Sequence, residues 1–242
     1  MATQLTVGAS ELTISNEGPL SPKTTYILSA RRSYLQGLFR LLNLPFLPTF
    51  NDFQVKTTTK INDKTELTFI GIGAIDQFVL NEEVPEEETP EQKDDRLYLL
   101  NILPVQSQWN YTTGAKLKRF RDNGFWTFVL SRNMLNNESY KYAGNNEEDE
   151  ENLLFNYRSQ ESENKFRAEN SIFGKGYTFK YGINLEYSRY LIDNFDRAVL
   201  SQTGETIDFQ ATSNYTSYGA FVSGSKNWFG DRLLLSGGVR VD

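Results

Sequence analysis

A two-residue alternation of apolar and polar side chains runs through long stretches of this sequence and constrains its fold more than any other feature. From 179 to 188, Phe, Tyr, Ile, Leu and Tyr alternate with Lys, Gly, Asn, Glu and Ser. The same period recurs over 105–118, 165–172 and 233–241. Successive side chains of a β-strand point to opposite faces, so this period predicts strands with one apolar and one polar face.

Less regular alternation predicts further strands, which bring the total to about ten: 4–14, 24–32, 50–61, 65–78, 125–134 and 213–226. Short clusters of Gly, Asn, Asp and Pro separate them and predict tight turns, at 18–22, 62–64, 121–124, 174–176 and 230–231. The 40 to 60 residues between successive tight turns suit two strands joined by a long connection. We therefore expect an all-β, antiparallel, up-and-down order of strand, tight turn, strand and long connection.

Two short segments depart from the strand period. Leu35, Leu38 and Leu42 recur at helical spacing before Pro45, and Leu97, Leu100 and Leu103 do so less clearly before Pro104. Each predicts a short helix packed within a long connection.

Acidic residues are concentrated in two of the long connections. The formal net charge is −6, and 13 of the 31 Asp and Glu residues lie in 82–95 and 147–151. If the tight turns share one end of the strands, both acidic segments must lie at the other end. A negative net charge also argues against a nucleic-acid partner, which requires a basic face.

Several kinds of chemistry are excluded by composition. The chain has no Cys and no His, which removes disulfides, thiol nucleophiles, Ser-His-Asp triads and His metal ligands. The acidic stretch 82–95 lacks the spacing of a calcium loop, and Pro85 and Pro90 predict an extended, solvated segment there. We predict no catalytic residue, no cofactor-binding residue, no metal ligand and no cofactor, and we do not expect an enzyme.

Two architectures remain compatible with the alternation. Several segments reach 12 or more residues, long enough for tilted strands that cross a bilayer, which need about 9–11 residues. Aromatic residues beside the tight turns at 121–124, 174–176 and 230–231 predict one interfacial girdle of a membrane barrel. The alternative is a soluble sandwich. In a barrel, the inward polar face would include Gln106, Gln108, Asn110, Lys116, Lys118, Asn184, Glu186 and Arg240.

Four stretches resemble a known family. They are Ser-Ala-Arg-Arg-Ser-Tyr-Leu at 29–35, Leu-Pro-Phe-Leu-Pro-Thr-Phe-Asn-Asp-Phe at 44–53, the segment 61–71, and Gln-Trp-Asn-Tyr at 108–111. Together they resemble the barrel domain of TonB-dependent outer-membrane receptors, especially those of Bacteroidetes-type bacteria. The resemblance implies a 22-stranded barrel around a plug, which takes up a scarce ligand such as a ferric chelate or an oligosaccharide with energy passed on by TonB. It also implies that the tight turns face the periplasm and the long acidic loops face outside.

The resemblance implies that residues 1–242 are a portion of such a barrel domain, without a plug or a signal peptide. It implies the outer membrane of a Gram-negative bacterium as the location. The partners implied are outer-membrane lipid, an unidentified small-molecule or oligosaccharide ligand, and, in the full-length protein, the TonB system. The alternative is a self-contained β-rich binding or adhesion module that uses the long loops at 79–95 and 138–157.

Overall fold

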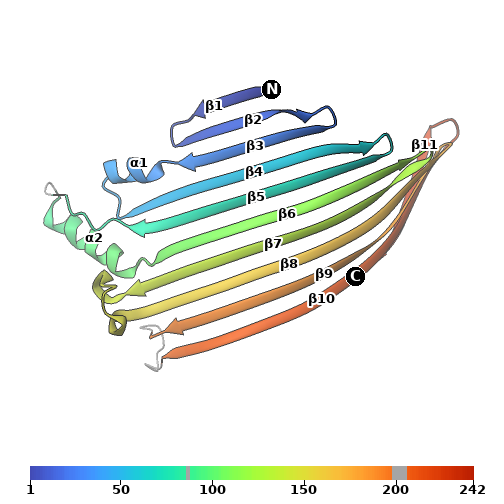
Figure 1. Ribbon diagram of the computed structural model, residues 1–242. Helices are drawn as coiled ribbons and strands as arrows, with labels where there is room; N and C mark the ends of the chain where they lie inside the picture. Colours follow the sequence, from blue (N-terminus) through green and yellow to red (C-terminus); the bar gives the residue numbers. More distant parts are fainter. Residues whose placement is uncertain (86–87, 198–205) are drawn as a thin grey trace.

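The computed structural model describes residues 1–85, 88–197 and 206–242. Within these ranges, eleven strands form one antiparallel sheet whose spatial order is the chain order, as Figure 1 shows. The strands are β1 (Ala2–Val7), β2 (Glu11–Ser21), β3 (Thr24–Ser33), β4 (Phe46–Asn62), β5 (Thr65–Leu80), β6 (Val105–Arg121), β7 (Gly124–Tyr142), β8 (Leu153–Gly174), β9 (Tyr177–Asp196), β10 (Ile207–Trp228) and β11 (Leu233–Val241). The predicted all-β, up-and-down order is confirmed.

The first predicted strand is wrong in one respect. Residues 4–14 do not form one strand, because β1 and β2 pair as a hairpin whose turn falls at 8–10. The Gly8 amide donates to the Glu11 carbonyl over 2.8 Å and closes this turn. The small residues Gly8-Ala9-Ser10 are the turn signal that the alternation pattern concealed.

Both predicted helices are present in the long connections. Helix α1 (Leu35–Leu41) follows β3, and α2 (Pro90–Ile102) follows β5. The start of α2 corrects the expectation of an extended segment there, since Pro90 occupies the first turn of the helix. Thr89 and Gln92 form a capping box, in which each side chain satisfies a backbone amide of the other residue. Two 3-10 turns, Ala143–Asn145 and Glu150–Asn152, complete the connection between β7 and β8.

Apart from the turn at 8–10, which lies beside α1, the tight turns and the long connections lie at opposite ends of the strands, as the charge pattern predicted (Figure 1). The predicted turns at 62–64, 121–124, 174–176 and 230–231 each join two consecutive strands. Both acidic segments lie at the end that carries α1 and α2. Glu86 and Glu87 of the first acidic segment lie outside the described residues.

The strand register sorts side chains onto two chemically different faces. Ile183 of β9 is opposite Ala168 of β8 and Ala220 of β10. Following the pairs across the sheet gives one continuous row, made of Val241, Ala220, Ile183, Ala168, Phe128, Leu117 and Leu67. We call the face that carries this row the apolar face and the opposite one, which carries Asn184, the polar face.

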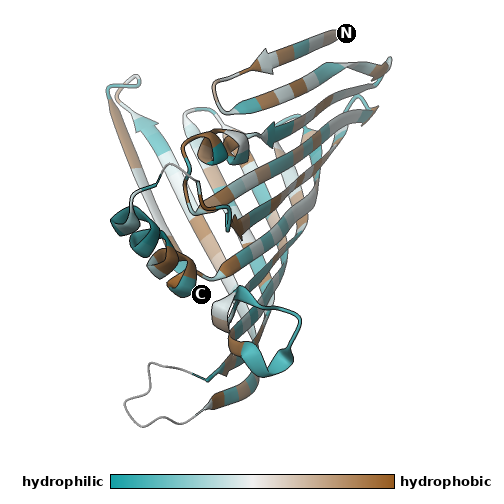
Figure 2. Cartoon of the chain, turned by 90° about the vertical axis from the view of Figure 1, so that its left-hand side faces the viewer, coloured by the Kyte–Doolittle hydropathy of each residue, from teal (hydrophilic) through white to brown (hydrophobic). Residues whose placement is uncertain are grey.

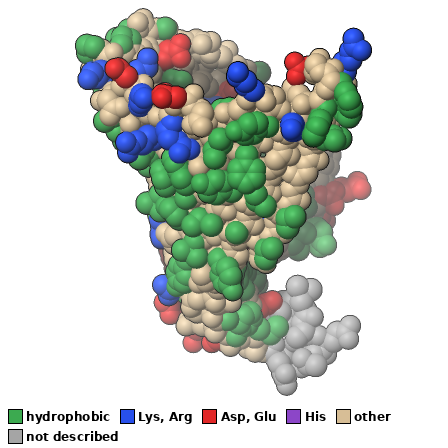
Figure 3. All heavy atoms as spheres, turned by 90° about the vertical axis from the view of Figure 1, so that its right-hand side faces the viewer, with side chains coloured by type: hydrophobic (Ala, Val, Ile, Leu, Met, Phe, Trp, Pro, Cys, Tyr) green, Lys and Arg blue, Asp and Glu red, His purple; other side chains and the backbone are tan. Residues whose placement is uncertain are grey.

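The apolar face is not covered by a second layer. Ile183 is 54 % exposed and Leu130 is 62 % exposed, and in the described ranges the only fully buried hydrophobic side chains are Leu47 and Leu100. Figure 3 shows hydrophobic side chains in a broad patch through the middle of the visible surface, with most Lys and Arg above it. A soluble sandwich requires two packed sheets, whereas every strand in the described part of this chain belongs to one sheet.

The sheet is curved into an open trough, which Figure 2 shows end-on. Small polar side chains of the polar face are buried, among them Ser159 and Ser188, whereas the large side chains of the apolar face stay exposed. This difference in exposure places the polar face on the inside of the curve. No helix in the described part of the chain has the length and hydrophobicity to cross a membrane.

Gly124 begins β7 at a point where no side chain fits. A Cβ atom added there would lie 2.0 Å from the Ser171 carbonyl oxygen of β8, whereas one added at Gly37 of α1 would meet no atom within 4 Å. We expect Gly124→Ala to lower the free energy of unfolding by about 1–3 kcal/mol, the usual cost of local backbone strain. Gly37→Ala is the matched control and should cost nothing. Thermal unfolding followed by circular dichroism measures both, and equal transition temperatures would contradict the prediction.

Candidate functional site

Charged and amide side chains recur from strand to strand across the polar face. The eight residues expected to point inward from a barrel all lie on it by register, namely Gln106, Gln108, Asn110, Lys116, Lys118, Asn184, Glu186 and Arg240. In its centre, Lys165 contacts Glu163 at 2.8 Å and Glu186 at 3.5 Å. These groups are partly exposed, so their ion pairs contribute little stability and keep the face hydrated.

A depression of about 560 Å³ opens on this face at the end of β4 to β8 nearest the long connections. Aromatic rings and polar side chains line it together: Phe50, Phe78, Phe155 and Tyr157 with Asp76, Gln106, Gln108, Asn137 and Ser139. None of these four rings is among the residues expected to point inward from a barrel. The sequence gives only a weak signal for them: Phe50 and Phe78 each have an Asp two residues away, whereas Phe155 and Tyr157 have apolar or aromatic neighbours at that spacing.

The lining of this depression is suited to a polar, uncharged or cationic ligand. Rings provide flat apolar contact surfaces, and amide groups both donate and accept hydrogen bonds. Asp76 adds one carboxylate, and no ion-pair partner for it occurs in the described ranges. Combined apolar walls and a few polar groups are typical of ligand sites. We therefore take this depression as the candidate binding surface.

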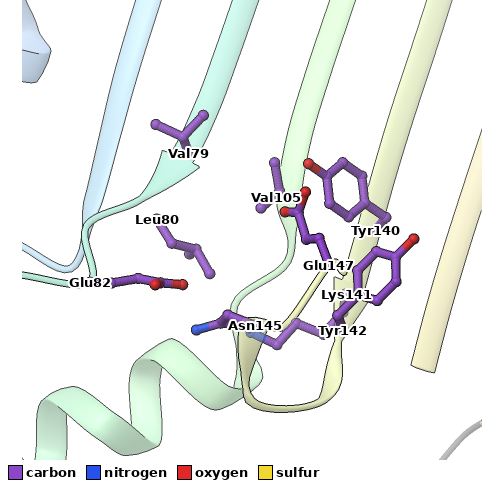
Figure 4. Close-up of a pocket in the computed structure, with 9 residues that line it drawn as sticks. All are labelled: Val79, Leu80, Glu82, Val105, Tyr140, Lys141, Tyr142, Asn145 and Glu147. Carbon is purple, nitrogen blue, oxygen red and sulfur yellow. Dashed lines mark hydrogen bonds between the residues drawn. The ribbon is translucent and has the colours of Figure 1, made fainter. Parts of the chain in front are cut away.

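A smaller cavity of about 160 Å³ lies between the ends of β5, β6 and β7 (Figure 4). Lys141 is the basic residue among those that line it. Its ammonium group donates to the Leu103 carbonyl over 3.0 Å, and also to the Leu100 carbonyl and to Asn145 Oδ1. An ammonium group has three donors, and all three are used here. Lys141 therefore ties the end of α2 to β7 and is not available to a ligand.

A second buried cation, Arg96, forms an ion pair with Glu88 at the start of α2. Arg96 is 6 % exposed, and its Nε donates to the Glu88 carboxylate over 2.9 and 3.1 Å. Its Nη2 also donates to the Asn43 carbonyl, just after α1. The guanidinium of Arg96 holds the pKa of the Glu88 carboxyl below its ordinary value of 4.5 through a hydrogen bond and charge attraction. Arg96 thus joins the two long connections at this end of the sheet.

The aromatic residues beside the tight turns, predicted to form one girdle, divide between the two faces of the sheet. Trp126, Tyr177 and Phe179 share the apolar face with Ile183. Phe120, Phe125 and Phe173 instead lie on the polar face, where consecutive rings are 6.2 and 5.8 Å apart and Lys118 sits 3.8 Å from the Phe125 ring. Sequence position near a turn cannot separate the two sets, because the faces alternate from one residue to the next.

Within residues 1–85, 88–197 and 206–242, no group of three or more acidic side chains is placed to hold a metal ion. The features that stand out are therefore a polar inner face, a depression on that face near the long connections, and an exposed apolar outer face. These features define an up-and-down β-sheet of the barrel type.

Solved structures with this architecture are similar along almost the whole chain. The ferric enterobactin receptor PfeA from Pseudomonas aeruginosa matches 95 % of it with a TM-score of 0.59 at 12 % identity. The ferric citrate transporter FecA matches 95 % with a TM-score of 0.58 at 8 % identity. The RagAB peptide transporter matches 95 % with a TM-score of 0.57 at 11 % identity. At such identities the likeness establishes the fold.

This chain spans only part of those structures, namely 36 % of the PfeA chain, 35 % of the FecA chain and 31 % of the RagAB chain. No protein-family model matches the sequence, and a search of curated proteins finds no significant match.

The Glu88–Arg96 pair generates a pH prediction for α2. Because the pKa of folded Glu88 is lowered, the pair stabilises α2 fully above 4.5, and this stabilisation is lost as the pH falls through the lowered value. The protection factors of the α2 amides, which correct for the pH dependence of the intrinsic exchange rate, should therefore stay constant from pH 7 to pH 5 and fall in stronger acid.

Glu88→Gln tests the same contact at neutral pH. It leaves the buried Arg96 charge without its carboxylate, so we expect α2 amides to exchange roughly tenfold faster. Glu91→Gln is the control, since Glu91 is an exposed acid in the first turn of the same helix. Equal exchange in the two variants would show that the pair does not hold α2.

Proposed function

We propose that residues 1–242 form part of the barrel wall of a TonB-dependent outer-membrane receptor, and that the whole protein takes up a scarce ligand across the outer membrane of a Gram-negative bacterium. One observation carries the proposal. The sheet has a single layer, and its apolar face is exposed along almost all strands. Water is a poor solvent for such a face, whereas the hydrocarbon of a bilayer covers it without cost.

The shape of the apolar band supports this placement. On β9 the band runs from Phe179 to Tyr187, a strand length of about 27 Å at the usual rise per residue, near the height of an outer-membrane band. On β2 its members are Leu12 and Ile14, which by register lie several rows nearer the long connections than Ile183 does. A band that slants across the register is expected when strands tilt by about 35–45° to the membrane normal.

The ligand is proposed as a small molecule or an oligosaccharide that contacts the depression between β4 and β8. The similar structures are a receptor for ferric enterobactin, a transporter of ferric citrate and a transporter of peptides. In this chain the acidic long connections lie at the same end of the sheet as the depression, which disfavours a ligand with excess negative charge. Since these similar structures are receptors and transporters, we also propose that the protein is not an enzyme.

Intact mass and cell fractionation of the native gene product provide the first test. We expect a species far heavier than 27.8 kDa, the mass of this chain, in the outer-membrane fraction. Such a species would contain the rest of the barrel. A soluble product of 27.8 kDa would contradict the proposal and favour a self-contained binding or adhesion module.

Adjacent substitutions on β9 test which face meets lipid. Ile183→Arg places a charge in the middle of the apolar band. It should make the free energy of membrane insertion less favourable by about 2–4 kcal/mol, the cost of an arginine at the bilayer midplane. Asn184→Arg is the matched control, because its side chain lies on the polar face. Insertion of the full-length protein into vesicles, followed by protease protection, measures both. Equal insertion of the two variants would count against a lipid-facing apolar surface.

A further inference from the structure

Two arginines stand on the apolar face where its hydrophobic band ends toward the long connections. Arg132 follows Leu130 by two residues on β7, and Arg189 follows Tyr187 by two residues on β9. The register confirms that both belong to the apolar face, because Arg132 is opposite Asn164 and Asn164 is opposite Tyr187. Neither arginine points into the polar interior, so a role in binding the transported ligand is excluded.

Arg132 is oriented by neutral partners. Its Nε donates to the Tyr111 hydroxyl over 2.9 Å, and its Nη1 donates to Asn164 Oδ1 over 2.8 Å. Both acceptors come from neighbouring strands, so the guanidinium plane is held across β6, β7 and β8. These contacts orient the group without neutralising its charge.

Neither charge is balanced by a carboxylate. In the described ranges no ion pair involves Arg132 or Arg189, although Arg158 on the same face is paired with Glu138 at 2.7 Å. Arg132 is half-buried and Arg189 is exposed. Arg189 is opposite Ser162 of β8 and Asn214 of β10, which carry no charge.

The two arginines are close enough to act on one ligand. Arg189 lies two strands from Arg132 and two residues further along, which corresponds to a Cα separation of about 12 Å at normal strand spacings. Side chains of this length bridge such a gap around a group a few ångströms wide. Tyr187 lies on the same face, in the row of Arg132 and two residues before Arg189, and its hydroxyl donates to Asn214 Oδ1 over 3.3 Å.

We propose that Arg132 and Arg189 form a binding site for the phosphate of an anionic lipid headgroup on the outer surface of the barrel. The inference rests on the proposed membrane placement, which puts the end of the hydrophobic band at the level of the headgroups. Two guanidinium groups without carboxylates, one of them oriented by its neighbours, suit phosphate, which accepts their paired hydrogen bonds. A tyrosine beside them matches the usual amphipathic residue of this interface.

The site is tested on the full-length protein purified in an uncharged detergent. Phosphatidylglycerol or phosphatidylcholine is added, and bound lipid is counted by native mass spectrometry. We expect the protein to retain phosphatidylglycerol preferentially, and Arg132→Gln and Arg189→Gln each to weaken its binding about fivefold, equivalent to about 1 kcal/mol per arginine. The control is Arg167→Gln, since Arg167 lies on the polar face and contacts Glu169.

Each outcome separates the site from the proposed function. If the protein is in the outer membrane but the double variant binds phosphatidylglycerol as the wild type does, the lipid site is wrong and the receptor proposal stands. If inorganic phosphate competes at the same concentration as the lipid, the arginines bind free anions and the lipid site is also wrong. A soluble native protein would overturn both. Matching circular dichroism spectra in detergent establish that the variants are folded.

Discussion

The whole structure depends on one constraint. A single sheet satisfies the hydrogen bonds of its backbone, but it leaves the apolar side chains of one face without a layer to pack against. The antiparallel ladder from β1 to β11 pairs the strand amides and carbonyls with their neighbours. No second layer in the described ranges packs on the apolar face, where Ile183 and Leu130 remain exposed. A sheet of this kind is stable in water only if its apolar face is buried. In a sandwich a second sheet buries that face, so here the surroundings must do so. In the proposed function a bilayer does so on the apolar side and leaves the polar side free for solvent and ligand.

At the end of the sheet that carries the long connections, buried polar contacts hold the segments together. Arg96 and Lys141 are almost fully buried, and both cross-link the long connections to one another or to β7. A buried cation is unfavourable unless its hydrogen bonds are satisfied, and a carboxylate and several carbonyls meet most of that need here. These contacts give α1 and α2 fixed positions beside the depression on the polar face. The long connections at this end of the sheet are therefore fixed by buried hydrogen bonds and one ion pair, whereas the walls of the candidate site are fixed by strand register.

Much of this architecture could be predicted from the sequence. The alternation over 179–188 predicted both faces of β9, and the turn clusters predicted where strands pair. Local signals that compete with the alternation were harder to interpret. The turn at 8–10 interrupts a pattern that looked continuous, and the capping box at Thr89 overrode the extended conformation expected from Pro90. The depression was missed because its rings come from three strands, β4, β5 and β8, and their proximity follows from non-local pairing.

The sequence by itself determined the two faces, the order of the strands and the charge separation between turns and long connections. A two-residue period sets the direction of each side chain locally, so these features need no knowledge of distant contacts. Only the tertiary structure decided that the strands form one layer and not two, and that Phe125 faces the polar side while Trp126 faces the apolar side. The reason is that register is a property of strand pairs, and a shift by one residue would exchange the faces of a whole strand.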